Sequence, residues 1–324
     1  MRPFQRFAVD DASQVGEVRR AAQQLAQSLG FDEAAAGRVA LGVTELGTNL
    51  VRHAGGGALL LGVDGPAIEL LSLDSGPGMD VQRCLQDGFS TAGSAGTGLG
   101  AVKRLADRFD AFSMAGRGAV VSARFGAATP VPGFHVAGLG LAAPSEEVSG
   151  DGWGLRVDDQ RLQVMLADGL GHGPSAAEAA DLALALFQRA TAASPAALLE
   201  DAHASLRSTR GAAVTLVSLP AGGGSLVLAG AGNVMGRLIS GVSDRSLLAQ
   251  NGTLGVQIRR LQDVVHDWPE HAILVLHSDG IISRWSLGDA VGLLRCEPMV
   301  IAGWILRDHR RGRDDATVVV VRRH

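Results

Sequence analysis

Along the N-terminal part of the chain, the spacing of apolar residues is first that of a strand and then that of helices. Residues 4–9 alternate as a short strand, and apolar residues three or four positions apart predict a helix over 12–29. Asp32 is a typical helix-capping residue, so we expect a second helix to begin after it. This helix should run to about His53, and the glycines at 55–57 should end it. The pattern therefore predicts one strand followed by two helices.

Two apolar runs separated by a turn sequence come next. Residues 58–63 and 67–73 flank Asp64-Gly65-Pro66, an arrangement that predicts a β-hairpin. The stretch from Asp74 to Gly98 is rich in glycine, serine and threonine and is too polar for a core element. Beyond it we expect a helix over 99–109 and strands at 112–114 and 119–125.

A proline- and glycine-rich segment divides the chain. Residues 127–133 contain Pro130 and Pro132, which disfavour a continuous helix or sheet. We therefore predict two domains, 1–126 and 134–324, joined by this linker. In the second domain strands are expected at 134–139, 153–157, 162–167, 213–219, 225–229, 273–276 and 316–321, and helices at 174–190, 195–208 and near 299–308. This order is typical of an α+β fold in which helices cover antiparallel sheets.

The composition fits a globular protein and excludes several classes. Of the 324 residues, 46% are hydrophobic and 19% are charged, enough for two folded domains. A net charge of −4 does not favour nucleic-acid binding, and no apolar run is long enough to span a membrane. The first ten residues lack the apolar core of a signal peptide, and Cys84 and Cys296 follow no metal-ligand spacing. We expect a cytoplasmic protein with free thiols.

A carboxylate and a carboxamide share one face of the second predicted helix. Glu45 and Asn49 are four residues apart and so project from the same side, with His53 one turn further. Asn can bind Mg²⁺ through its oxygen, while Glu can accept a proton from an attacking hydroxyl. Taken alone, this pair is more typical of a solvated helix face.

Two glycine-rich motifs change that interpretation. Asp74 ends an apolar strand and precedes Gly76 and Gly78, which permit close backbone approach to a flat ligand, and its carboxylate can accept a hydrogen bond from an adenine amino group. Gly96-Thr97-Gly98-Leu99-Gly100 stands just before a predicted helix, where backbone N–H groups can hold phosphates. Each motif is weak by itself, but the helix pair and both motifs in this order indicate a nucleotide site.

The three motifs resemble the N, G1 and G2 boxes of the GHKL (Bergerat-fold) ATPases. The sequences ELGTNLVRHA, DSGPGM and GTGLGAVKRLAD are similar to those of the RsbT-like anti-sigma serine kinases of bacterial partner switching. The resemblance covers about residues 1–126 and implies an α/β sandwich that binds ATP and Mg²⁺. It implies Glu45 as general base, Asn49 as Mg²⁺ ligand, Asp74 as adenine contact and residues 96–100 as the lid over ATP.

Aspartates adjoin several predicted strands of the second domain. Asp168 and Asp279 each follow an apolar strand and precede a glycine, Asp314 precedes the last strand, and Asp151 follows Ser149-Gly150. A single Asp-Gly pair is typical of an ordinary turn. Carboxylates at strand ends can, however, meet at one edge of a sheet sandwich, and hard divalent cations prefer oxygen ligands. Together they predict a site for two Mn²⁺ or Mg²⁺ ions that activate a water and clamp a phosphate.

This second pattern is similar to the metal-dependent (PPM) serine/threonine phosphatases, specifically their SpoIIE-like branch and its small RsbX-like members. The resemblance covers about residues 134–324 and implies an α-β-β-α sandwich. It implies that Asp168 bridges both metals, that Gly169 offers its carbonyl to one, that Asp279 and Asp314 bind the other, and that Asp151 acts through water. Asp315 is the alternative to Asp314. His172 is expected to be a turn residue, with a phosphate contact as the alternative.

Together the resemblances imply a bifunctional regulator of partner switching. The kinase-like domain would phosphorylate a serine or threonine of a STAS-type protein and the phosphatase would reverse this, with a sigma factor as a further candidate partner. In the alternative, the first domain only binds ATP or a sigma or STAS partner, and the phosphatase alone is catalytic. Glu45 favours the first possibility, because a pure binding module needs no base. A third possibility is that both domains are scaffolds. The complete set of aspartates in the second domain argues against it.

Overall fold

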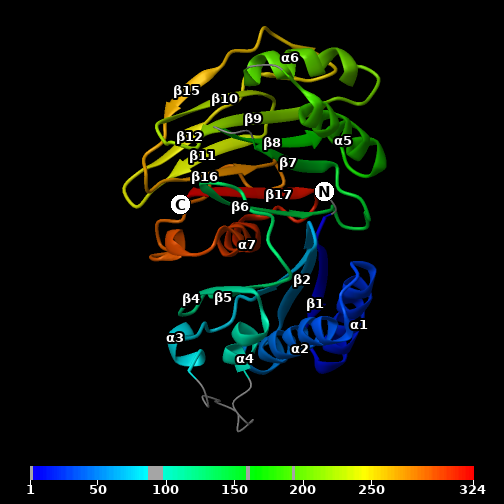
Figure 1. Ribbon diagram of the computed structural model, residues 1–324, viewed down its shortest axis with the longest axis vertical. Helices are drawn as coiled ribbons and strands as arrows, with labels where there is room; N and C mark the ends of the chain where they lie inside the picture. Colours follow the sequence, from blue (N-terminus) through cyan, green and yellow to red (C-terminus); the bar gives the residue numbers. More distant parts are fainter. Residues whose placement is uncertain (1–2, 87–97, 158–160, 192–193) are drawn as a thin grey trace. The chain divides into compact units, whose positions relative to one another are not determined.

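The computed structural model describes residues 3–86, 98–157, 161–191 and 194–324, which form two compact units of mixed helix and strand (Figure 1). The first unit consists of Phe4–Pro130 and Arg295–Arg307, and the second mainly of Val131–Leu294 and Asp308–His324. The fold class is α+β, as the sequence predicts. The two units divide between Pro130 and Val131. Segment 295–307, however, belongs to the first unit although it lies inside the second domain proposed from the sequence.

The first unit is built on one five-stranded antiparallel sheet (Figure 1). Its elements are β1 (Gln5–Val9), α1 (Ala12–Ser28), α2 (Glu33–Asn49), the π-helix η1 (Leu50–Ala54), β2 (Gly57–Asp64), β3 (Ala67–Leu73), α3 (Val81–Cys84), α4 (Gly98–Leu105), β4 (Arg108–Met114), β5 (Gly118–Phe125) and most of α7 (Pro298–His309). The strands lie in the order β1-β2-β3-β5-β4. Helix α2 packs between α1 and α4 and contacts the central strands, so it is the element that joins the helices to the sheet.

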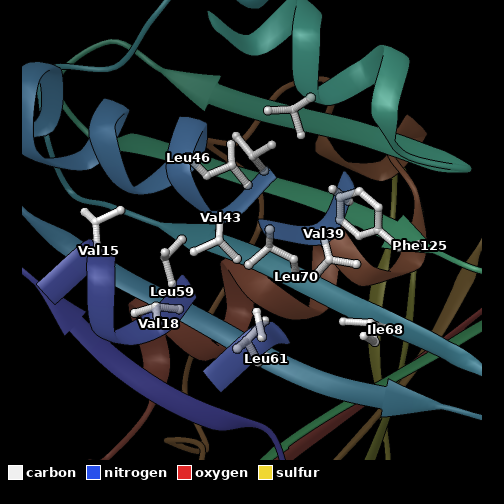
Figure 2. Packing of buried hydrophobic residues seen from close by; sticks show 14 of the residues in the cluster. Val15, Val18, Val39, Val43, Leu46, Leu59, Leu61, Ile68, Leu70 and Phe125 are labelled. Carbon is white, nitrogen blue, oxygen red and sulfur yellow. The ribbon is translucent and has the colours of Figure 1, made fainter. Parts of the chain in front are cut away.

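An apolar core lies between these helices and the sheet (Figure 2). Val39, Val43 and Leu46 of α2 lie at helical spacing and pack in one cluster with Leu59 of β2 and Leu70 of β3, all of them at most 1% exposed. Burying one such side chain contributes roughly 1.5–3 kcal/mol. This burial fixes the rotation of α2 about its axis, and with it the direction of its remaining side chains.

Side-chain caps start the first two helices, and the second of them, Asp32, is the cap that the sequence predicts. The Asp11 carboxylate accepts hydrogen bonds from the backbone N–H of Ser13 and Gln14, and the Gln14 side chain accepts one in return from the Asp11 N–H. Asp32 accepts a bond of 2.7 Å from the N–H of Ala35. The second helix ends as expected, because Gly55 adopts a left-handed conformation, with φ of 75°, after η1.

Helix α7 packs on the other face of the first sheet. Strand side chains alternate between faces, and Leu70 and Val121 belong to the core under α2, so Leu71 and Val120 face the opposite side. A Cβ placed on Gly303 of α7 would lie 2.9 Å from Val120 and 3.1 Å from Leu71. Glycine therefore allows the α7 backbone to lie directly on the sheet.

The second unit is built on two five-stranded antiparallel sheets (Figure 1). Its elements are β6 (Phe134–Leu141), β7 (Asp151–Val157), β8 (Arg161–Gly169), α5 (Pro174–Arg189), α6 (Pro195–Leu206), β9 (Ala212–Pro220), β10 (Ser225–Ala231), β11 (Met235–Ile239), β12 (Asp244–Leu247), β13 (Gly252–Thr253), β14 (Gln257–Ile258), β15 (Val264–Asp267), β16 (Ile273–His277), the 3₁₀-helix η2 (Leu293–Arg295) and β17 (Ala316–Arg323). The sheet orders are β15-β10-β9-β8-β7 and β12-β11-β16-β17-β6, beside a small β13-β14 pair.

Strand β8 shows how the layers of the second unit pack. Its residues Leu162, Val164 and Leu166 point into a core shared with strands of the second sheet, whereas Met165 and Ala167 point into a core shared with α5 and α6. The near-continuous apolar sequence of β8 is therefore explained by burial on both faces. Over the part of the chain that the structure describes, no helix has the length and apolar character needed to cross a bilayer.

The structure also corrects the expected elements. The helix predicted over 99–109 ends at Leu105, and β4 begins at Arg108, because the Asp107 N–H pairs with a β5 carbonyl and draws the chain into the sheet. The short elements α3, β11, β12 and β15 were missed. In β11 the apolar pattern is interrupted by Arg237, which is buried through its pairing with Asp244 and a 2.9 Å hydrogen bond to the Trp285 carbonyl.

Candidate functional sites

A cavity of about 580 Å³ in the first unit brings most of the nucleotide motifs together. Its lining comes from α2, η1, the segment after β3 and the start of α4. The predicted residues among those that line it are Glu45, Asn49, Asp74, Gly78, Gly98 and Leu99. Gly76 lies in the segment after β3 and Gly100 in α4, outside the lining, whereas Gly96 and Thr97 fall outside the described residues.

Glu45 and Asn49 occupy the last turn of α2. Directly after Asn49 the helix widens into η1, and such π-type turns are frequent at functional sites. Burial raises the pKa of the Glu45 carboxyl, and the nearby charge of Arg52 opposes that rise. A carboxylate with a raised pKa is a better proton acceptor than an exposed glutamate, so Glu45 suits the role of a general base.

Asp74 is held by backbone hydrogen bonds on one carboxylate oxygen. Its Oδ1 accepts from the N–H of Gly76 at 2.9 Å and from the N–H of Ala119 at 3.2 Å. These bonds tie the carboxylate to β5 and to its own loop. Because both fall on Oδ1, the second oxygen keeps its capacity to accept a hydrogen bond from a ligand in the cavity.

The glycines after Asp74 have a packing role within the protein. Gly78 has φ of 80°, and a Cβ there would lie 2.3 Å from the Met114 carbonyl oxygen. A Cβ on Gly76 would lie 2.8 Å from the Ala54 backbone. Both positions therefore require glycine so that the loop can lie against β4 and η1, which fixes the cavity wall.

The second unit places two of the predicted aspartates side by side. Asp151 at the start of β7 is the cross-strand partner of Asp168 near the end of β8. The Ser278 hydroxyl, from the segment after β16, donates to Oδ2 of Asp151 at 2.6 Å. The other oxygen, Oδ1, is buried and has no hydrogen-bond partner among the described residues. A buried carboxylate oxygen without a donor is energetically costly, so its environment suits a cation.

Asp279 and Asp314 lie close enough to Asp168 to affect its protonation. Burial raises the pKa of Asp168, and the negative charges of Asp151, Asp279 and Asp314 raise it further. Burial also raises the pKa of Asp279, with Asp314 adding to the effect and Arg311 opposing it. The like charges repel, and a bound cation would remove this repulsion.

The neighbouring carboxylates of Asp314 and Asp315 have different surroundings. Both oxygens of the buried Asp315 accept backbone hydrogen bonds of 2.8 Å, from the N–H groups of Ala143 and Gly150. Asp314 is half-buried, and its charge acts on Asp168 and Asp279. Asp315 therefore holds the segment before β7 in place, although its charge also raises the pKa of Asp151. Asp314 acts on the other two members of the acidic group, Asp168 and Asp279.

The remaining predicted residues lie in the segment around the end of β8. The Gly169 N–H donates to the Gly150 carbonyl at 3.0 Å, and a Cβ on Gly169 would lie 2.0 Å from the Ala176 carbonyl oxygen, so a side chain cannot fit. His172 is exposed, and its Nδ1 lies 2.8 Å from the Glu146 carboxylate. The side-chain partner of His172 is therefore Glu146, from the segment between β6 and β7.

Two contact residues were not predicted from the sequence. Ser278 binds Asp151, and the Asn233 side chain donates to Asp279 Oδ2 at 2.7 Å. Ser278 precedes Asp279 directly, so its position was a usable signal, whereas nothing in the pattern around Asn233 distinguishes it from an ordinary turn residue.

The donor set of the second unit fits divalent cations. It consists of aspartate oxygens, which Mn²⁺ and Mg²⁺ prefer, and it includes the unpartnered Asp151 Oδ1. Over the described ranges, no three carboxylate, imidazole or thiol groups already stand in a closed metal-ligand geometry. The carboxylates are thus gathered at one place without yet forming a tight ligand cage.

Comparison with known proteins connects these units to families. The family model for the histidine kinase-like ATPase domain matches residues 8–125, and the model for stage II sporulation protein E (SpoIIE) matches residues 158–324, over half of the chain. The chain belongs to the SpoIIE family. Its N-terminal part is a histidine kinase-like ATPase domain, so this SpoIIE-family chain is a fusion of two domain types.

Individual known proteins resemble parts of this SpoIIE-family chain. The serine/threonine-protein kinase RsbT of Bacillus subtilis (strain 168) is 35% identical over 112 residues, which cover 32% of this chain and 83% of RsbT. A structure from work on the bacterial stressosome, as a modular system adapted to control secondary messenger signaling, is 26% identical with a TM-score of 0.55, covering 58% of this chain and 99% of that one. The RsbU and RsbW domains of Rv1364c from Mycobacterium tuberculosis share the fold at 21% identity and a TM-score of 0.51, over 60% and 61% of the two chains.

Proposed function

We propose that this chain is a cytoplasmic, bifunctional regulator of bacterial partner switching. The first unit transfers phosphate from ATP to a serine or threonine of a STAS-type protein, and the second unit removes it with two divalent cations. The observation that carries the proposal is the coexistence in one chain of a cavity lined by Glu45, Asn49 and Asp74 and of an acidic group centred on Asp168.

In the proposed kinase reaction, the cavity residues divide the work. Asp74 accepts a hydrogen bond from the adenine amino group through the oxygen that its backbone contacts leave available. Asn49 offers its side-chain oxygen to the Mg²⁺ that accompanies ATP. Glu45 accepts the proton of the acceptor hydroxyl as that oxygen attacks the γ-phosphorus, and the bond to ADP breaks. The 35% identity to a serine/threonine-protein kinase supports transfer to a hydroxyl rather than to histidine.

In the proposed phosphatase reaction, the aspartates act as ligands and orienting groups. Two Mn²⁺ or Mg²⁺ ions, when bound, would neutralise the phosphate oxygens and activate the attacking water. Asp168 is within electrostatic reach of Asp151, Asp279 and Asp314 and is the residue suited to both ions, with Asp279 and Asp314 holding one of them. Gly169 offers its carbonyl, and Asp151 is oriented by the Ser278 hydroxyl so that it acts through water.

The proposed partner follows from the relatives. RsbT is a serine/threonine-protein kinase, and the stressosome structure comes from work on a modular system that controls secondary messenger signaling, so both relatives support a regulatory protein partner. A STAS-type protein with an acceptor serine is the substrate that both units would share, and a sigma factor is a further candidate partner. An acidic, non-basic chain agrees with a protein partner, since the net charge is −4.

The alternative is that the first unit only binds a nucleotide or a partner. The position of Glu45 in the cavity wall, with burial raising its pKa, argues for catalysis. A binding module has no need of a proton acceptor there.

Nucleotide binding is tested by titrating the full chain with Mg·ATP in a calorimeter. We expect saturable binding that Asp74→Asn weakens by at least about tenfold, because a hydrogen bond to a charged group contributes roughly 1.5–3 kcal/mol. Asp10→Asn, at an exposed position outside the cavity lining, is the matched control. Unchanged affinity in a folded Asp74→Asn protein would remove the adenine assignment.

Hydrolysis is tested on a phosphoserine peptide with and without added Mn²⁺. We expect phosphate release to require the ion and to stop with a chelator while circular dichroism stays unchanged. Release that continues at full rate in the chelator would contradict the two-metal proposal.

A further inference from the structure

Helix α7 lies in the sequence matched by the SpoIIE model, yet its residues up to Arg307 belong to the first unit. At its N-terminal end, the Glu297 N–H donates to the Asp110 carboxylate at 2.6 Å, and the Glu297 carboxylate pairs with Arg108 at 2.9 Å. In its middle, Trp304 packs edge-to-face on Phe112 with 4.9 Å between ring centroids. The N-terminal end and the middle of α7 thus both contact β4.

The C-terminal end of α7 contacts the nucleotide site through Arg307. The Arg307 guanidinium donates a hydrogen bond of 2.7 Å to the backbone carbonyl of Asp74 and a longer one, of 3.4 Å, to the carbonyl of Ala119. These are the two residues that the Asp74 carboxylate itself connects, because Oδ1 accepts from the Ala119 N–H. The guanidinium also lies 3.8 Å from the centre of the Trp304 ring, which holds it in place.

Arg307 therefore clamps the backbone of the proposed adenine-binding residue from the face of the sheet opposite α2. A charged donor to a backbone carbonyl is among the stronger protein hydrogen bonds. Any adjustment of Asp74 when adenine binds changes the position of the carbonyl that Arg307 holds. Arg307 is accordingly a positioning residue for this site.

Beyond Arg307 the chain continues into the second unit, toward the segment that carries Asp314. The chain passes from one unit to the other within α7, since Asp308 already belongs to the second unit. There the Ile282 N–H donates to the His309 carbonyl at 2.9 Å, and the Arg311 N–H donates to the Gly280 carbonyl at 2.8 Å. The residues that follow α7 thus pair with the segment directly after Asp279.

A few residues later the chain reaches Asp314, so the end of α7 is tied to both segments that carry the proposed ligands of one metal ion. A small movement of the helix end would change the spacing of Asp279 and Asp314. Metal sites respond to such changes, because ligands and their supports must stay within a fraction of an ångström of their working geometry.

We propose that α7 couples the two sites: nucleotide bound in the first unit changes the rate of metal-dependent hydrolysis in the second, with Arg307 as the link to Asp74. The inference rests on the proposed function, since it needs both a nucleotide site and a phosphatase site. A ligand shifts an equilibrium only by its differential affinity for two states, and typical coupling between sites changes affinities by 5- to 150-fold.

The experiment measures hydrolysis of p-nitrophenyl phosphate by the full chain at saturating Mn²⁺, with and without saturating ADP. ADP occupies the nucleotide site without donating a γ-phosphate, and the small substrate needs no protein partner. Calorimetry on each protein sets the ADP concentration that saturates it. We expect ADP to change the wild-type rate by about fivefold or more, the low end of typical couplings.

Three variants identify the route of the effect, each compared with its own rate without ADP. Arg307→Ala should bring the ratio of rates close to one, and Arg307→Lys, which keeps a charged donor, should give an intermediate ratio. Arg189→Ala, at the exposed last residue of α5, should keep the wild-type ratio. If Arg307→Ala does not fold by circular dichroism, the Arg307→Lys comparison carries the test.

The possible results separate this inference from the proposed function. A wild-type protein that binds ADP and hydrolyses the substrate, with a ratio of one, overturns the coupling and leaves the proposed function intact. A wild-type ratio in folded Arg307→Ala at saturating ADP overturns the role of Arg307. Absence of ADP binding or of hydrolysis in the wild type overturns the proposed function and the coupling with it.

Discussion

The proposed nucleotide cavity of the first unit and the acidic group of the second unit are assembled in contrasting ways. The cavity takes Glu45 and Asn49 from one helical turn and Asp74 from the end of a nearby strand. The acidic group takes Asp151 and Asp168 from paired strands and adds carboxylates that lie far along the chain. The first is therefore mainly a local construction, whereas the second depends on the topology of the two sheets.

The electrostatics of the two regions differ as well. The cavity mixes signs, with Arg52 and Arg83 beside Glu45 and Asp74 in its lining. In the acidic group, like charges raise the pKa of Asp168 and Asp279, on top of the effect of burial. A site of mixed sign can bind an uncharged base and a charged phosphate together, whereas a site of one sign needs cations before it can bind phosphate at all.

The largest expected effect comes from Asp168. Asp168→Ala removes the side chain suited to both ions, so we expect metal binding and hydrolysis to be lost together. The loss should exceed the roughly 10- to 100-fold typical of residues that only support a ligand. Phosphate release from a phosphoserine peptide and metal content after dialysis are the two measurements.

Asp181→Asn, on the exposed side of α5, provides the matched control for this variant and should behave like the wild type. Wild-type hydrolysis by Asp168→Ala would show that the acidic group is not the catalytic site. The contrast drawn above between the two regions would then fail.

The second effect concerns Glu45, the proposed base in the cavity. Glu45→Gln keeps the shape of the side chain but cannot accept the hydroxyl proton, so transfer to a protein acceptor should fall by about 10²–10⁴-fold. Mg·ATP binding measured by calorimetry should persist. Glu33→Gln, in the exposed first turn of the same helix, should leave transfer unchanged. Full transfer by Glu45→Gln would support the binding-module alternative for the first unit.

A third comparison separates the adjacent aspartates. Asp315→Asn weakens two buried backbone hydrogen bonds, so it should lower the free energy of unfolding by about 1–3 kcal/mol in a urea titration. Asp314→Asn should leave unfolding nearly unchanged and reduce Mn²⁺ affinity. The reverse outcome, with Asp314 governing stability and Asp315 governing metal affinity, would exchange the two roles.

The smallest expected effect is a shift in pH dependence. Because burial raises the pKa of Glu45 above its ordinary 4.5, the transfer rate should fall with decreasing pH through that raised value. The charge of Arg52 lowers the pKa, so Arg52→Gln should move the acidic limb of the rate at saturating ATP to still higher pH. A limb that stays in place or moves to lower pH in this variant would show that Glu45 does not control it.

Most of the fold was predictable because the residues that a helix or strand buries recur at regular spacings in the sequence. The cap at Asp32 and the apolar runs of β2 and β3 are local signals, and all of them appear in the structure. Strand β11 could not be found, since Arg237 interrupts its apolar pattern and is buried only through its contacts with Asp244 of the next strand and with the Trp285 carbonyl. The place of α7 in the first unit could not be found either, because its apolar pattern does not specify which sheet it covers.

In the candidate sites as well, the features set by local spacing were predictable and those set by contacts distant in the sequence were not. The spacing of Glu45 and Asn49 on a helix needs no tertiary information, and the cavity does contain both. The different surroundings of Asp314 and Asp315 depend on hydrogen bonds from Ala143 and Gly150, which no local pattern reveals. Arg307 has no sequence signal at all, because its partner carbonyl belongs to Asp74 at the other end of the chain.

The central claim, that the two units perform opposed phosphate chemistry, is tested most directly by one steady-state measurement. The full chain is incubated with Mg·ATP, Mn²⁺ and a STAS-domain acceptor protein, and intact mass gives the phosphorylated fraction of the acceptor. The account predicts an intermediate fraction for the wild type, a rise toward completion for Asp168→Asn, and a fall toward zero for Glu45→Gln. An Asp168→Asn fraction equal to that of the wild type, or a Glu45→Gln protein that still phosphorylates the acceptor, would contradict it.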